Sequence, residues 1–255
     1  MSESEVNQGV TRRGFIKAGA VGAGALALGL GAGEAKAQEA VPKKWDRTVD
    51  VVVVGAGGAG LAAAVTAREK GADVLVLEKM TIIGGNTLIS GGFFNAADPK
   101  RQGRLNIQDS AENHFKQTLA AGDYRADVEK VKILATNAND AVQWLESLGM
   151  KFDDKVIQIY GALYPRSHVP VDPKGTGYIK TLKAAADQRG VKILTDTKVD
   201  SIIREKPLSG RVLGVKVFDK RKKALYIRAR KAVVLASGGF GANKELRSLH
   251  DPRMK

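Results

Sequence analysis

The residues best suited to chemistry form a short glycine-rich run, Gly-x-Gly-x-x-Gly, at positions 55–60. Its candidate binding positions are Gly55, Gly57, Ala59 and Gly60. In a nucleotide-binding turn the first glycine permits a tight bend, the second lets the backbone approach a pyrophosphate, and the third allows close packing of helix on strand. The free N–H groups and the positive dipole end of the following helix would face the phosphates. The run therefore predicts a phosphate-binding turn.

The flanking segments are those that such a turn needs. Residues 49–54 form a β-branched apolar run, typical of a strand buried on both faces of a parallel sheet. Residues 61–70 read as a helix, and residues 72–77 read as a second apolar strand that leads to Glu78. An acid at this place accepts hydrogen bonds from ribose hydroxyls. Strand, glycines, helix, strand and acid follow in the order that predicts a dinucleotide site.

The segment after Glu78 carries Gly-Gly-Asn-Thr at 84–87, Ser-Gly-Gly at 90–92 and Asn-Ala-Ala at 95–97. With these motifs the chain resembles the FAD-dependent fumarate reductase/succinate dehydrogenase flavoprotein superfamily. The resemblance is strongest to its soluble periplasmic branch of flavocytochrome c-type fumarate reductases and related urocanate and methacrylate reductases. It implies that the cofactor is FAD. A glycine-rich surface loop is the alternative reading of the same segment.

The resemblance also implies further cofactor contacts, carried over by position. Asn86 and Thr87 would hydrogen-bond the cofactor, and Gly91 and Gly92 would place bare backbone against the flavin ring. Val199 would contact the adenine end through its backbone, and Ser237 with Gly238 would close over the nucleotide. The expected FAD-binding residues are Gly55, Gly57, Ala59, Gly60, Glu78, Lys79, Gly85, Asn86, Thr87, Gly91, Gly92, Val199, Ser237 and Gly238.

The rest of the chain predicts an α/β fold, a Rossmann-like FAD-binding domain with a parallel sheet and an antiparallel β-meander. Helices are expected at 109–122, 127–148 and 178–188, and a strand at 191–195. The expected meander comprises runs 198–204, 211–218 and 224–229, followed by a separate returning strand at 231–236. In the second helix one buried stripe is expected, made of Val128, Val131, Leu134, Ala135, Ala138, Val142 and Leu145.

The histidines offer little chemistry. The loop 161–177 contains Arg166, His168 and Pro170, and a structural hydrogen bond is the expected role of His168. His114 and His250 look incidental, so no metal site is expected. The sequence has no Cys, which excludes disulfides, iron–sulfur clusters, CxxCH haem attachment and thiol catalysis.

The N-terminus resembles a twin-arginine (Tat) export signal. Residues 11–17 carry Arg12-Arg13, residues 18–33 are Gly/Ala-rich and apolar, and an Ala-x-Ala site ends at Ala37. The apolar run is too short to cross about 30 Å of hydrocarbon, which argues against a permanent membrane anchor. We therefore expect a signal peptide at 1–37, recognised by the Tat machinery, a periplasmic location, and an FAD-binding domain at 38–255.

The chain is strongly basic, with 41 Lys+Arg against 27 Asp+Glu and a net charge of +14. Most of the excess lies beyond residue 200. Nucleic acid is not expected as a partner, because aromatic residues are only 5% and none interleave with the charges. The run 220–223 is read as a solvated turn, or otherwise as a docking patch for an acidic partner.

By resemblance, the activity is reduction of the C=C bond of a small unsaturated carboxylate with electrons from a c-type cytochrome. With no haem motif in this chain, the haem is expected on a separate protein. None of the superfamily's catalytic motifs matches this sequence, and Arg166 does not correspond to its proton donor, so no catalytic residue is assigned. The capping domain is expected to be absent, as in a fragment or truncated reading frame. The alternatives are a dehydrogenase or oxidase of the same fold, or a non-catalytic FAD-binding fragment.

Overall fold

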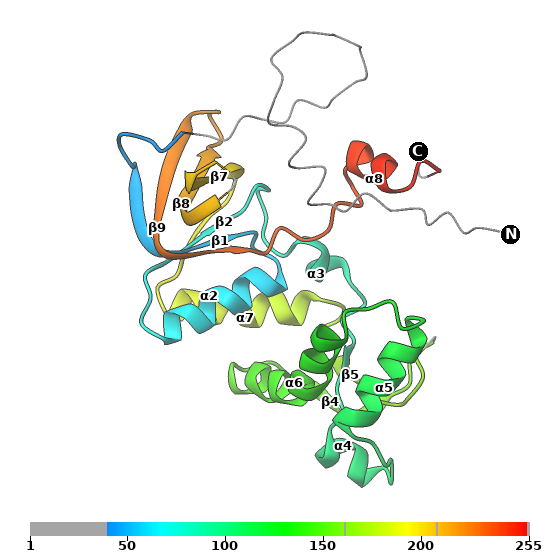
Figure 1. The fold of residues 1–255 in the computed structure, drawn as a ribbon. Coiled ribbons are helices and arrows are strands. Elements are labelled where there is room, and N and C mark those ends of the chain that lie inside the picture. The colour runs from blue at the N-terminus through cyan, green and yellow to red at the C-terminus, as the bar shows by residue number, and fades with distance from the viewer. Residues whose placement is uncertain (1–39, 161, 208, 254–255) are drawn as a thin grey trace, which may run out of the picture. The chain divides into compact units, whose positions relative to one another are not determined.

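A six-stranded sheet carries the glycine-rich turn on its central strand (Figure 1). The computed structural model describes residues 40–160, 162–207 and 209–253, so the predicted signal peptide lies outside the described residues. The strand order is β6-β2-β1-β9-β8-β7, with β6, β2, β1 and β9 parallel and β9, β8 and β7 antiparallel. The bounds are Arg47–Val54 (β1), Val74–Leu77 (β2), Lys192–Leu194 (β6), Lys198–Lys206 (β7), Ser209–Phe218 (β8) and Ala224–Leu235 (β9).

Both faces of β1 are buried, as expected for a central parallel strand. On one face Val51 and Val53 belong to a core shared with α2 (Gly58–Glu69) and α7 (Thr176–Gln188), the two helices drawn below the sheet in Figure 1. On the other face Val49 and Val52 join a second core that includes meander residues such as Val215. The predicted parallel sheet and antiparallel meander are confirmed.

The prediction of two separate strands at 224–229 and 231–236 was wrong, because β9 is one continuous strand. Residues 224–228 pair with β8, and residues 227–235 pair with β1 through a register shift. The charged pair Arg230-Lys231 looked like a break in the sequence. In the structure Asp50 holds these side chains at the surface, 2.9 Å from Arg230 Nε and 3.7 Å from Lys231 Nζ. The strand therefore continues through them.

A second, three-stranded antiparallel sheet has the order β3-β5-β4 and lies beside a group of helices. Its strand β5 occupies part of the predicted loop 161–177, because Ser167 and His168 pair with β3 and β4. The strands are Phe94–Asn95 (β3), Phe152–Ile157 (β4) and Ser167–Pro170 (β5), and the helices are Pro99–Arg104 (α4), Ala111–Ala121 (α5) and Val128–Ser147 (α6). Two short helices, Gly85–Ile89 (α3) and Lys244–His250 (α8), complete the described elements.

Helix α6 has the predicted ends but only part of the predicted buried stripe. Asp127 caps its first turn by accepting a hydrogen bond from the Lys130 amide, and Gly149 follows it with φ +98°. Ala135, Ala138, Val142 and Leu145 are buried as predicted. Val128 and Leu134 are 50% and 56% exposed, so the prediction was wrong for them. Helical periodicity identifies an apolar stripe, but it cannot show how far along that stripe the neighbouring elements reach.

Candidate FAD site

The turn between β1 and α2 has the geometry predicted from its glycines. Gly55 has a φ of +103°, and a Cβ there would lie 2.4 Å from the Ala236 carbonyl oxygen. A Cβ on Gly60 would lie 1.8 Å from the Gly55 carbonyl oxygen. At Gly57 the nearest atom to an added Cβ is 3.6 Å away, an ordinary contact. The packing of the chain thus requires Gly55 and Gly60, whereas at Gly57 it leaves room for a ligand to approach the backbone.

The N-terminus of α2 presents a positive dipole end to this turn. No side chain caps it, and its first turn holds no acidic residue. The Gly58 amide donates to Thr87 Oγ1 at 3.1 Å, which ties the predicted Gly-Gly-Asn-Thr loop to the start of the helix. With no acidic residue in its own first turn, the helix end suits the negative phosphates of a dinucleotide.

Glu78 lies directly beneath the turn and is only 7% exposed. Its Oε2 accepts from the Ala56 amide at 2.8 Å, and its Oε1 accepts from the Met80 amide at 2.9 Å. The acid at the end of β2 is therefore in contact with the glycine turn.

Segments that carry other predicted residues come to the same carboxyl edge of the sheet. Gly84 bridges to Gly57 and donates its amide to the Ala56 carbonyl at 2.9 Å. The Thr197 amide donates to the Glu78 carbonyl at 2.8 Å, which brings the start of β7 to this edge. Ser237 lies just after β9, and its Cα is so close to the glycine turn that a Cβ added to Gly55 would lie 3.4 Å from it. Of the predicted cofactor contacts, Lys79, Gly85, Asn86, Ser237 and Gly238 are exposed, and Val199 on β7 is half-buried.

The packing of the protein itself requires a glycine at position 92. A Cβ there would lie 2.1 Å from the Lys174 carbonyl oxygen, and the Tyr178 hydroxyl donates to the Gly92 carbonyl at 2.7 Å. Burial raises the pKa of Tyr178, so this hydroxyl keeps its proton. Gly91 is exposed, and a Cβ there would contact only the Phe93 ring, at 3.3 Å. Of the predicted pair, Gly91 is thus the one that leaves bare backbone open.

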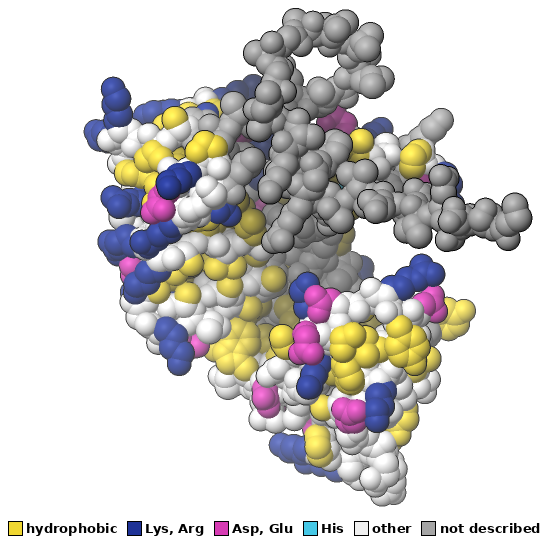
Figure 2. Space-filling view, viewed as in Figure 1, with side chains coloured by type: hydrophobic (Ala, Val, Ile, Leu, Met, Phe, Trp, Pro, Cys, Tyr) yellow, Lys and Arg dark blue, Asp and Glu magenta, His cyan; other side chains and the backbone are white. Residues whose placement is uncertain are grey.

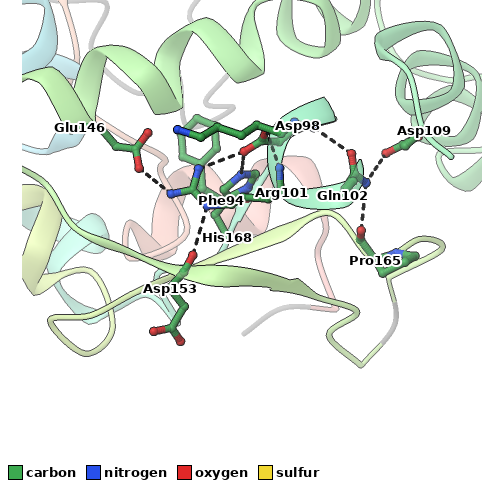
Figure 3. A network of polar contacts seen from close by, with 10 residues as sticks. Phe94, Asp98, Arg101, Gln102, Asp109, Glu146, Asp153, Pro165 and His168 are labelled. Atoms are coloured by element: carbon green, nitrogen blue, oxygen red, sulfur yellow. Dashed lines mark hydrogen bonds and ion pairs between the residues drawn. The ribbon is translucent and has the colours of Figure 1, made fainter. Parts of the chain in front are cut away.

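A buried polar network supports the segment that follows Gly92 (Figure 3). His168 is fully buried, with Nδ1 3.1 Å from the Phe94 carbonyl oxygen and Nε2 3.1 Å from Asp98 Oδ2. The expected structural hydrogen bond of His168 is confirmed. Burial alone would raise the pKa of Asp98, but hydrogen bonds from His168 and Arg101 outweigh it and lower that pKa to about 2.

The network extends through two arginines that join distant elements. Arg101 contacts Asp98 at 2.9 Å and Glu146 of α6 at 2.5 Å. Arg166 binds both carboxylate oxygens of Asp109, at 3.0 and 2.9 Å. Sequence reasoning missed most of this network. One local signal was available, since Asp98 precedes Pro99 and an acid before a proline is typical of a helix start.

His114, for which the sequence suggested no role, is buried. It is 5% exposed, and Nδ1 has no hydrogen-bond partner among the described residues. Burial, together with the charge of Arg166, lowers its pKa, so the ring is neutral near pH 7. Within the described ranges there is no cluster of His, Cys, Asp or Glu able to hold a metal, and no helix is long and apolar enough to span a membrane.

Comparison with known proteins gives this geometry a family. Residues 50–254 match the FAD binding domain family. The chain is 37% identical over 221 residues to a urocanate reductase of Eggerthella lenta, covering 86% of this chain and 36% of that protein. A flavocytochrome c3 fumarate reductase structure in the open conformation superposes with a TM-score of 0.77 and 36% identity, covering 83% of this chain and 37% of that one.

A third similar protein is the 3-ketosteroid-Δ4-(5α)-dehydrogenase from Rhodococcus jostii RHA1, solved with 4-androstene-3,17-dione. Its TM-score is 0.75 with 30% identity, covering 85% of this chain and 52% of that one. The chain belongs to the FAD binding domain family, within the fumarate reductase/succinate dehydrogenase flavoprotein superfamily, and its cofactor is FAD. It spans 36–37% of the urocanate and fumarate reductases compared here.

Proposed function

We propose that this chain is the FAD-binding part of an exported reductase that saturates the C=C bond of a small unsaturated carboxylate. The observation that carries the proposal is the joint placement of the glycine turn, Glu78 and Thr87 at one sheet edge, in a family that includes urocanate and fumarate reductases. The proposed electron donor is a c-type cytochrome on a separate protein. The proposed location is the periplasm, reached through the Tat signal at 1–37.

The chain's own residues would hold the cofactor in a fixed orientation. Amides at Gly57, Ala59 and Gly60 would bind the pyrophosphate at the positive end of α2. Glu78 would hold the ribose, and Val199 would contact the adenine end through its backbone. FAD, when bound, supplies hydride transfer to an activated double bond.

A second set of residues would enclose and position the cofactor. Asn86 and Thr87 would hydrogen-bond it, Lys79 and Gly85 would flank it, and bare backbone at Gly91 would lie against the flavin. Gly92 would support that backbone from behind, given its contact with Lys174. Ser237 and Gly238, at the end of β9, would close over the nucleotide.

Binding and turnover are tested separately. The purified chain supplied with FAD should be yellow after gel filtration, and a colourless product would overturn the FAD site. Turnover is tested on the full-length enzyme of which this chain is proposed to be the FAD-binding part. Its flavin, reduced with a low-potential dye under anaerobic conditions, should be reoxidised by fumarate, urocanate or methacrylate. If none of the three reoxidises the yellow full-length enzyme, the reductase part of the proposal is wrong and FAD binding stands.

A dehydrogenase or oxidase of the same fold is the second candidate. The superposition with the 3-ketosteroid dehydrogenase at a TM-score of 0.75 favours it, because that relative carries the same fold with a different kind of substrate. Steady oxygen consumption with a saturated substrate would support this candidate. A chain that binds FAD and turns over nothing would be a non-catalytic FAD-binding fragment.

A further inference from the structure

A cavity of about 750 Å³ lies between β3, α5 and α6. Aromatic residues from the segment after Gly92 form one wall, and side chains from two helices form the others. Its lining includes Phe93, Phe94, His114, Lys130, Ile133 and Leu134. Cavities of roughly 300–1,000 Å³ are typical of sites for small organic ligands.

The walls are apolar and uncovered among the described residues. Phe93 is 45% exposed, Ile133 is 62% exposed and Leu134 is 56% exposed. The sequence predicted Leu134 in the buried stripe of α6, but the side chain lies exposed at the cavity instead. Hydrophobic side chains that line one cavity in this way mark a place where an apolar group binds, since isolated exposed side chains would have no reason to converge.

The most deeply buried polar residue of the lining is His114; Asn95, Thr118 and Asn137 also line the mostly apolar cavity. The His114 ring lines the cavity, is 5% exposed, and lacks a partner for Nδ1 within the described residues. A neutral imidazole offers one donor and one acceptor. His114 therefore gives the cavity a buried ring nitrogen that is open to a directional contact with a ligand.

The charge of the cavity argues against a dicarboxylate. Lys130 is the cation among its lining residues, and Asp127 already pairs with it at 2.9 Å. Two carboxylates of a ligand would therefore meet no unpaired positive charge in this wall. An uncharged, ring-sized apolar group fits better, with the polar end of the ligand directed elsewhere.

The position of the cavity connects it to the candidate FAD site. Phe93 and Phe94 directly follow Gly91 and Gly92, the segment proposed to lie against the flavin. We propose that the cavity binds the apolar, ring-sized substituent of a small carboxylate, with His114 as its polar contact. That this ligand is also the reducible substrate rests on the proposed function, whereas the binding itself does not.

Calorimetric titration of the whole chain tests the proposal with three probes. 3-Phenylpropanoate is saturated and cannot be reduced, cinnamate adds the double bond, and fumarate lacks the ring. We expect both aromatic probes to bind at least tenfold more tightly than fumarate. Equal binding of all three, or tighter binding of fumarate, would overturn the proposal.

Two variants locate the binding. Leu134→Asn should weaken 3-phenylpropanoate at least fivefold, whereas Val128→Asn, on the same helix, similarly exposed and outside the cavity lining, should not. Should Leu134→Asn fail to fold, Ile133→Asn replaces it. His114→Phe, which keeps an apolar ring, should weaken binding severalfold. Wild-type affinity in all cavity variants would contradict the site.

Titrations with and without FAD separate this proposal from the proposed function. Aromatic binding in a chain that fails to take up FAD would leave the cavity standing and remove the flavoenzyme proposal. Normal FAD binding with no aromatic binding would leave the FAD site standing and overturn the cavity proposal. Aromatic binding without reoxidation of reduced flavin by cinnamate would show a ligand site that is not the reducible substrate's.

Discussion

At the residue scale, the glycines of this chain differ in what requires them. Gly55 and Gly60 are required by backbone atoms that a Cβ would strike, whereas Gly57 has only an ordinary contact at 3.6 Å. Side chains are excluded at the first two positions by folding itself. Packing does not require glycine at position 57, where we propose that the backbone approaches the pyrophosphate.

Gly60→Ala should therefore impair both stability and FAD retention. Its Cβ would lie 1.8 Å from the Gly55 carbonyl oxygen, and α2 would have to move away from β1. Overpacking of this kind costs about 1–3 kcal/mol. Denaturant unfolding and flavin absorbance after gel filtration measure the two effects. Gly103→Ala, in α4 with no atom within 4 Å of the added Cβ, is the control and should retain both properties.

Asp98 should control the response of stability to acid. Its pKa is about 2 in the folded protein against an ordinary 3.8, so its contribution is complete above pH 3.8 and is lost as the pH falls toward 2. At neutral pH Asp98→Asn should lower the free energy of unfolding by roughly 3–5 kcal/mol, since it breaks a buried pair. The gap between variant and wild type should narrow between pH 4 and pH 2.

Unfolding curves across that pH range provide the measurement. Asp251→Asn is a suitable control, because Asp251 also has a lowered pKa but pairs with Arg253 at the surface. It should change stability little at any pH. A constant gap for Asp98→Asn between pH 7 and pH 2 would show that the carboxylate charge is not what stabilises the network.

At the scale of elements, the segment 92–98 is held by three neighbours. Tyr178 of α7 holds the Gly92 carbonyl, His168 of β5 lies against the Phe94 carbonyl and Asp98, and Ser167 Oγ donates to Asn95 Oδ1 at 2.6 Å. An irregular segment fixed by so many contacts can present backbone to a cofactor with little ordering cost on binding. The polar network thus acts as support for the candidate site.

Tyr178→Phe should loosen that support. The change leaves the buried Gly92 carbonyl without its hydrogen bond, at a cost of about 1–3 kcal/mol. We expect lower thermal stability and faster loss of FAD on dilution, followed by flavin fluorescence. Tyr124→Phe, at a side chain that is 73% exposed, should match the wild type in both measurements. Unchanged FAD release in Tyr178→Phe would show that this contact does not position the flavin segment.

At the scale of the whole molecule, charge is distributed unevenly over the described surface. Lys and Arg side chains cluster on the side that carries β7, β8 and β9 (Figure 2). The run 220–223 forms the turn between β8 and β9 and is exposed throughout, in agreement with a solvated turn. Exposed basic side chains of this kind favour solubility and association with acidic surfaces. The net charge of the chain does not determine its fold.

Export also belongs to this scale, because a Tat signal addresses a folded, cofactor-loaded protein as one cargo. Replacing Arg12 and Arg13 together by Lys should retain the protein in the cytoplasm, whereas the wild type is expected in the periplasm. Cell fractionation with immunoblotting measures the distribution. Arg125→Lys, whose side chain is 85% exposed, should export normally. Equal export of the double variant would refute the signal.

The sequence predicted the elements that have strong local patterns. The β-branched run of β1, the glycine turn, the acid after β2 and the paired runs of the meander all came out as expected. It failed where side chains find partners far along the chain. Asp50 of β1 pairs with Arg230 of β9, and His168 pairs with Asp98 at a separation of 70 residues. No local pattern records such pairs.

What the sequence determined by itself was the βαβ unit and its dinucleotide chemistry, because the strand, the glycine-rich turn, the helix, the second strand and its acid follow one another between residues 49 and 78. Tertiary structure decided at which of these positions packing itself requires glycine, and it decided which residues of the apolar stripe on α6 are buried. It buried His114 and exposed Leu134 around one cavity. Burial is a property of neighbours in space, and those neighbours come from segments that meet only when the chain folds.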